Sequence, residues 1–127
     1  LWMRCSGVQV SPRHILTAGH CMYRVRNVTD FCSQNSTARD NYPVLDKHYW
    51  SVYVGSECSR IELCQNAFKV SKVVVYKHFD YCEKVNDLAL MELASDVPYS
   101  NGIPICMPDK NMPLSKTVKA DGSGFGS

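Results

Sequence analysis

One histidine, His20, lies where a side chain could act as a general base. It follows a short stretch that ends in small residues, Leu16-Thr17-Ala18-Gly19, and directly precedes Cys21. A disulfide from Cys21 to Cys5, sixteen positions earlier, would fix the backbone beside the histidine. A catalytic imidazole needs such support because it must stay within hydrogen-bond reach of its nucleophile. A histidine beside a cysteine can also be structural or part of a metal site, so the segment alone leaves these roles open.

Two asparagines carry the acceptor pattern for N-glycosylation. Asn27-Val28-Thr29 and Asn35-Ser36-Thr37 both fit N-x-S/T without proline at the middle position. Both lie in one polar stretch, so we expect glycans at Asn27 and Asn35, with unused acceptor sites as the alternative. Glycosylation would place the protein outside the cell.

Seven cysteines are many for 127 residues, and none forms a C-x-x-C pair. This pattern predicts disulfides in an oxidising, extracellular compartment. The odd number leaves one cysteine without a partner in this stretch, and the first residues show neither an initiating methionine nor a signal peptide. We therefore interpret the chain as part of a longer protein. A zinc module built from His78, Cys82, Cys58 and Cys64 is a weak alternative, because these spacings fit no common zinc finger.

Composition excludes several classes of protein. The chain weighs 14.3 kDa, with 45% hydrophobic and 20% charged residues, which predicts a single folded domain. Its net charge is +2, without runs of like charge, which argues against binding to nucleic acid or to a charged membrane surface. The apolar runs are too short to span a bilayer.

The elements that must position these side chains are short strands. Apolar residues alternate with polar ones in most of the apolar segments. One segment, Leu88–Leu93, is apolar on both faces apart from Glu92, which predicts a strand buried on both sides. We expect Phe68, Val70, Val74 and Tyr76 to share one face of their strand, interrupted by Lys72. The polar stretch Asn27–Lys47 and the tail Asp121–Ser127 are predicted to be loops. The class is all-β, with these expected strands: Cys5–Val10, His14–Ala18, Trp50–Val54, Phe68–Lys77 and Leu88–Leu93.

Two segments resemble the chymotrypsin/trypsin-like serine peptidases. Leu16-Thr17-Ala18-Gly19-His20-Cys21 is similar to the family's Leu-Thr-Ala-Ala-His-Cys box, with Gly19 in place of one alanine. Asn86-Asp87-Leu88-Ala89-Leu90-Met91-Glu92-Leu93 resembles the Asp-Ile-Ala-Leu-Leu segment, in which the family carries its catalytic aspartate. Weaker similarities follow in the family's order: His78-Phe79-Asp80-Tyr81 to His-Pro-x-Tyr, Pro104-Ile105-Cys106-Met107-Pro108 to Pro-Val-Cys-Leu-Pro, and Gly124-Phe125-Gly126 to Gly-Trp-Gly.

The resemblance implies an architecture. It predicts the N-terminal, six-stranded Greek-key barrel of the two-barrel trypsin-like fold, with the second barrel missing. Residues 1–127 would then be a partial peptidase domain, with the barrel at about 1–108. Residues 109–127 would form the connector and the start of the second barrel.

The resemblance also implies a function, a secreted serine endopeptidase that acts on proteins or peptides without metal or cofactor. His20 would be the general base, and Asp87 would orient its ring, so the two side chains should be in contact. Asp87 could otherwise be a turn carboxylate. We expect His78 to be structural or exposed, and His14 and His48 stay unassigned.

Departures from the family pattern limit this reading. His20 and Asp87 lie 67 positions apart, more than the roughly 45 of the shorter members. The nucleophile segment Gly-Asp-Ser-Gly-Gly is absent, and Asp121-Gly122-Ser123-Gly124 differs from it in order, so Ser123 is not expected to be a nucleophile. The chain should be inactive alone. The alternative is a secreted, non-catalytic pseudoprotease or binding module.

The resemblance also suggests disulfides. It supports the bond between Cys5 and Cys21 and leaves Cys106 unpaired within this chain. The other four cysteines allow three connectivities, of which we favour Cys58 with Cys64 and Cys32 with Cys82.

Overall fold

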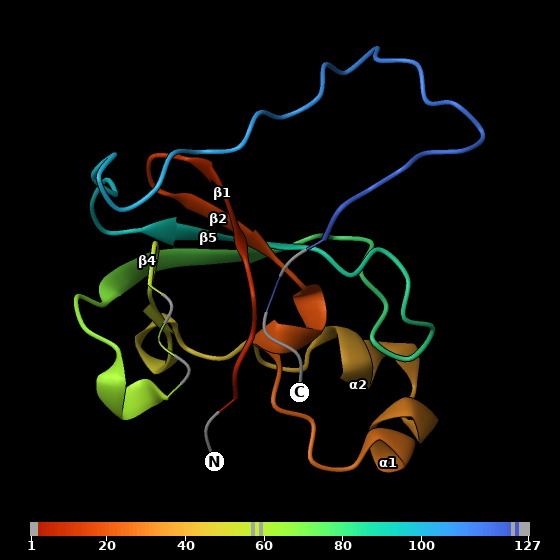
Figure 1. Cartoon of the computed structure of the whole chain (residues 1–127). Helices are drawn as coiled ribbons and strands as arrows, with labels where there is room; N and C mark the ends of the chain where they lie inside the picture. The colour runs from red at the N-terminus through yellow and green to blue at the C-terminus, as the bar shows by residue number, and fades with distance from the viewer. Residues whose placement is uncertain (1–2, 57, 59, 123, 125–127) are drawn as a thin grey trace.

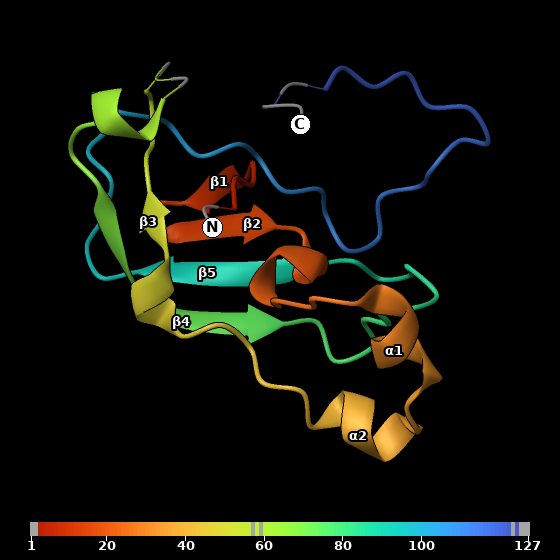
Figure 2. The ribbon, with the colours of Figure 1, turned by 90° about the horizontal axis from the view of Figure 1, so that it is seen from below.

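The computed structural model describes residues 3–56, 58, 60–122 and 124, and its centre is one curled antiparallel sheet (Figure 1). Five strands lie in the order β1-β2-β5-β4-β3. The sheet forms a half-barrel, which confirms the all-β, trypsin-like barrel class. The resemblance predicted six strands, but the described residues form five, with β1 and β3 at the two edges of the sheet and β2, β5 and β4 between them (Figure 2). The strands are β1 (Val8–Ser11), β2 (His14–Thr17), β3 (Ser51–Val52), β4 (Phe68–Val75) and β5 (Ala89–Leu93).

A β-bulge changes which residues of β4 face the core. Val70 pairs with Leu93 and Lys72 with Glu92, so one extra residue of β4 lies between these pairs. Val70 is therefore buried, whereas Val74 is 47% exposed and Val73 takes the half-buried position. The expectation that one face carries Phe68 to Tyr76 was wrong, because the bulge reverses the alternation.

The core lies on the concave side of the sheet. In β5, Ala89, Met91 and Leu93 are buried, while Leu90 and Glu92 are only partly covered. The expectation of a strand buried on both faces was thus wrong for the outer face. The buried cluster comprises Ile15, Cys21, Met22, Val70, Ala89, Met91, Leu93 and Val97.

The segment expected to be a loop at 27–47 contains two short helices, α1 (Val28–Ser33) and α2 (Ser36–Asp40). The side chain of Asn27 accepts a hydrogen bond from the N–H of Asp30, and that of Asn35 accepts one from Ala38. Asparagine is a favourable N-cap because its side-chain oxygen satisfies an otherwise unpaired N–H of the first turn. Both helices are shorter than the window in which a helical period can be recognised, which explains why the pattern missed them.

In the described part of the chain there are also three single-turn 3-10 helices: η1 (Gly19–Met22), η2 (Lys47–Tyr49) and η3 (Ile61–Leu63). Beyond β5, the described residues to 124 form no strand or helix, and this segment arches over the sheet (Figure 1). It is attached to β1, since the N–H of Ile105 donates to the carbonyl of Gln9 at 2.8 Å.

Three disulfides close the fold: Cys5–Cys21, Cys32–Cys82 and Cys58–Cys64. These are the pairs favoured from the sequence. Cys106 is free and exposed. No helix in the described part of the chain has the length and apolar character needed to cross a bilayer.

Candidate active site

His20 and Asp87 meet at one end of the sheet despite the 67 positions between them. The Nδ1 atom of His20 lies 2.6 Å from Oδ2 of Asp87, and the backbone N–H of His20 donates to Oδ1 at 2.7 Å. The carboxylate therefore holds both the ring and the backbone of one residue. The His20 side chain is 57% exposed and that of Asp87 34%, so the ring remains accessible from solvent.

The end of β2 positions His20. The strand passes through Ala18 into η1, where the N–H of Cys21 donates to the carbonyl of Ala18 at 3.2 Å. Cys21 is buried, and its bond to Cys5 ties η1 to the segment before β1. The histidine thus projects from a single helical turn that is fixed covalently.

Gly19 allows a close approach of Phe79. A Cβ atom at position 19 would lie 3.1 Å from two ring carbons of Phe79 and 3.2 Å from the carbonyl oxygen of Leu88. Phe79 stands where the family pattern quoted above has proline, and Gly19 stands where it has alanine. The two departures are therefore in contact, and the smaller residue makes room for the larger one.

A closed turn between β4 and β5 positions Asp87. At its base, the N–H of Tyr76 donates to the carbonyl of Leu88 at 2.9 Å. Higher in the turn, Asp80 accepts hydrogen bonds from the N–H groups of Glu83 and Cys82, both at 2.9 Å. The hydrogen bond from Glu83 lowers the pKa of Asp80 against the opposing effect of desolvation, and lesser contributions from Cys82 and Arg39 also lower it.

An aromatic cluster packs the segment after His20, including α1, against this turn. The rings of Tyr23 and Phe31 contact rings of the turn: the ring centroids of Tyr23 and Phe79 are 5.9 Å apart, and those of Phe31 and Tyr81 are 5.4 Å apart. Burial raises the pKa of Tyr23. The disulfide Cys32–Cys82 joins α1 to the same turn, so the segment after His20 and the turn before Asp87 form one unit.

The other histidines lack this long-range support. His48 Nδ1 also lies 2.6 Å from a carboxylate, Asp46, but the two are sequence neighbours and both are largely exposed. Hydrogen bonds from the backbone N–H and ring of His48 lower the pKa of Asp46, which caps η2. His14 Nδ1 lies 2.6 Å from Oγ of Ser11 in the turn between β1 and β2, and the exposed His78 packs edge-on against Tyr76.

The remaining sequence candidates fall into three groups. The zinc alternative was wrong, because Cys58, Cys64 and Cys82 are all in disulfides and have no thiolate to offer a metal. Asn27 and Asn35 are exposed N-caps. Ser123 lies outside the described residues.

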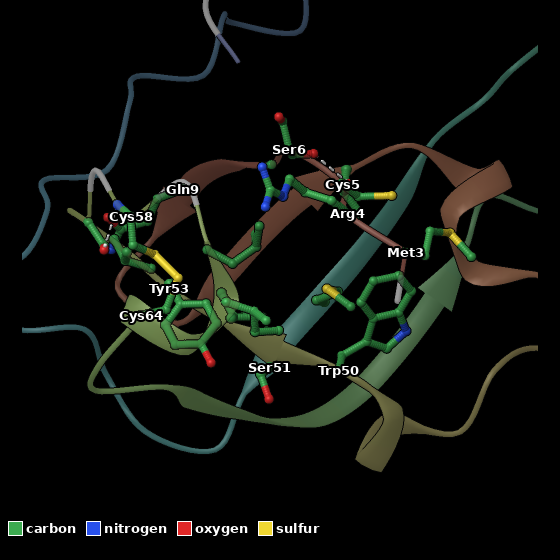
Figure 3. A pocket seen from close by; sticks show the side chains of 18 of the residues that line it. Met3, Arg4, Cys5, Ser6, Gln9, Trp50, Ser51, Tyr53, Cys58 and Cys64 are labelled. Atoms are coloured by element: carbon green, nitrogen blue, oxygen red, sulfur yellow. Dashed lines mark hydrogen bonds between the residues drawn. A yellow bond between two sulfur atoms is a disulfide. The ribbon is translucent and has the colours of Figure 1, made fainter. Parts of the chain in front are cut away.

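A cavity of about 410 Å³ lies apart from the histidine, on the concave side of the sheet between the edge strands β1 and β3 (Figure 3). Trp50, Tyr53 and Met3 line it together with the Cys58–Cys64 disulfide, but neither His20 nor Asp87 does. The cavity is therefore not part of the candidate active site.

Comparison with known proteins agrees with the fold class. The family model described as Trypsin matches residues 3–127, and the chain therefore belongs to the trypsin family of serine proteases. It is 27% identical over 127 residues to tissue-type plasminogen activator of Sus scrofa and 26% identical over 128 residues to that of Bos taurus. Each alignment covers 96% of this chain but 19% of the relative, so the chain spans about a fifth of their length.

Proposed function

We propose that this chain is the N-terminal half of a secreted serine endopeptidase in which His20 and Asp87 supply the base and the acid of a catalytic triad. The observation that carries the proposal is the 2.6 Å contact between His20 Nδ1 and Asp87 Oδ2 in a chain of the trypsin family. The serine nucleophile and the oxyanion donors come from a second barrel outside residues 1–127. Residues to about 108 form the first barrel, and the rest connect it to the second.

In this mechanism the serine hydroxyl attacks the carbonyl carbon of a peptide bond and gives its proton to Nε2 of His20. His20 then donates that proton to the leaving amine, and water releases the acyl group by the same route. Asp87 accepts the Nδ1–H, keeps Nε2 free as the base and stabilises the imidazolium. No step needs a metal or a cofactor.

Three disulfides and the two sequons support an extracellular location, with glycans at Asn27 and Asn35. Each cap bond uses Oδ1 of the asparagine, whereas a glycan is attached to Nδ2. The cap and the glycan are therefore compatible in one side chain.

The test compares residues 1–127 with the complete protein that contains them, using a serine-directed fluorophosphonate and casein. Residues 1–127 alone should show neither labelling nor cleavage, and the complete protein should show both. His20→Ala should abolish both reactions, and Asp87→Asn should lower kcat about 10⁴-fold.

Matched controls separate catalysis from local damage. His48→Ala removes a histidine with the same ring-to-carboxylate distance, and Asp96→Asn removes a carboxylate that is paired with Arg13 on the surface. Both should leave labelling unchanged. A complete protein that folds but neither labels nor cleaves would identify a pseudoprotease, and labelling of Ser123 in residues 1–127 would contradict the assignment of the nucleophile.

A further inference from the structure

Asn86, directly before Asp87, has a left-handed backbone conformation with φ of 55°. Among the described residues other than glycine, only Asn66 and Lys84 share a positive φ. Such a conformation brings Cβ close to the following carbonyl, and asparagine tolerates it better than most residues. The backbone therefore bends sharply just before the carboxylate that meets His20.

Two hydrogen bonds hold Asn86 in place. Its side-chain Nδ2 donates to the carbonyl of His78 across the turn at 3.1 Å, and its own carbonyl accepts from the N–H of Leu88 at 2.8 Å. Leu88 is in turn bonded to Tyr76 at the base of the turn. Asp87 thus lies between a residue bonded across the turn and a residue bonded to Tyr76, directly after β4.

We propose that Asn86 is a positioning residue, which orients Asp87 toward His20 through its left-handed backbone and its amide bond to His78. The carboxylate must meet two donors at once, the backbone N–H of His20 at 2.7 Å and the ring Nδ1 at 2.6 Å. Both hydrogen bonds can form only if the backbone at position 87 points the Asp87 side chain toward His20. Because the Asp87 side chain is 34% exposed, water replaces these donors once that direction is lost.

The catalytic meaning of this role rests on the proposed function, but its test does not need activity. A carboxylate at Nδ1 favours the Nδ1–H tautomer of a neutral imidazole. Long-range ¹H–¹⁵N spectra of residues 1–127, recorded well above the ordinary histidine pKa of about 6.5, report the tautomer of His20. Wild type should be mainly Nδ1-protonated, and Asp87→Asn gives the reference spectrum without the carboxylate.

Asn86→Ala removes both the amide bond and the tolerance for positive φ, and we expect the His20 spectrum to move toward that of Asp87→Asn. Asn86→Gly keeps the backbone conformation and loses only the amide bond, so its shift should be smaller. Glycine also accepts the native φ without strain, which makes Asn86→Gly decisive if the alanine variant fails to fold.

The control is Asn66→Ala, which changes an exposed asparagine with φ of 63° before β4. It imposes similar backbone strain far from Asp87 in the sequence, and the tautomer should not change. A folded Asn86→Ala with the wild-type tautomer, or an equal shift in Asn66→Ala, would overturn the proposal. A shift confined to the Asn86 variants would support it even if the complete protein proved to have no peptidase activity.

Discussion

At the scale of the residue, the contact between Gly19 and Phe79 shows how the chain departs from its family without losing the site. Gly19→Ala places a Cβ atom 3.1 Å from the Phe79 ring, so we expect a destabilisation of about 1–3 kcal/mol. In a Phe79→Ala background the same change should cost less, because the clashing ring is gone. Denaturant unfolding of the double-mutant cycle measures this coupling, and additive free energies would show that the two residues are independent.

The ionisation of Asp80, in the turn before Asp87, should make the stability of the protein depend on pH. Its folded-state pKa lies below the ordinary 3.8, so its ionised form adds stability that is complete above that value. This contribution is lost as pH falls through the lower folded-state pKa. Asp80→Asn keeps an acceptor for Glu83 and Cys82 but has no charge to titrate. Wild type should therefore be the more stable protein above about pH 4, with a gap that narrows in stronger acid. Unfolding midpoints between neutral pH and pH 2 test this, and a gap independent of pH would contradict it.

At the scale of the element, each sequon asparagine has a second role as a helix cap. Asn27→Ala should lower the free energy of unfolding by about 0.5–2 kcal/mol through loss of the hydrogen bond to Asp30. This loss should occur whether or not the wild-type asparagine carries a glycan. Asn27→Asp should retain the cap and lose the glycan. Thr29→Ala should lose the glycan and keep the asparagine.

Intact mass and denaturant unfolding of protein from a secreting host separate these effects. Equal losses of stability in Asn27→Ala and Asn27→Asp would assign the effect to the glycan instead of the cap. The pair Asn35 and Thr37 offers the same comparison for α2, where the cap bond goes to Ala38.

At the scale of the whole molecule, the outer face of the sheet carries a continuous apolar row. Val8 lies opposite Leu16, Leu16 opposite Leu90, and Leu90 opposite Val74, and directly paired residues share a face. Val8 and Val74 are 46% and 47% exposed. Residues 1–127 should therefore self-associate as concentration rises.

Val74→Lys should weaken this association in sedimentation velocity experiments, because it places a charge within the row. Tyr99→Lys adds the same charge at a residue that is 72% exposed and outside the sheet, so it serves as the matched control. Equal effects of the two variants would mean that net charge governs the association and the sheet face does not.

The sequence by itself determined what depends on neighbouring residues. Alternating apolar side chains located most of the strands, because a strand's faces follow a period of two along the chain, and a short apolar run located β5. The box around His20 and the segment around Asp87 were recognisable because each consists of consecutive residues. Among the four inner cysteines the sequence left three connectivities open, and the fold formed the favoured one.

Only the tertiary structure decided what depends on residues far apart in the sequence. The bulge after Val70 reversed the faces of β4, and the caps at Asn27 and Asn35 produced helices too short to show a period. The contact between Asp87 and His20 was expected only from the family resemblance, and in the structure the closed turn, the aromatic cluster and the Cys32–Cys82 bond lie beside it. Spacing along a chain cannot encode such a contact, since its geometry is the sum of many packing contacts between segments that are close only after folding.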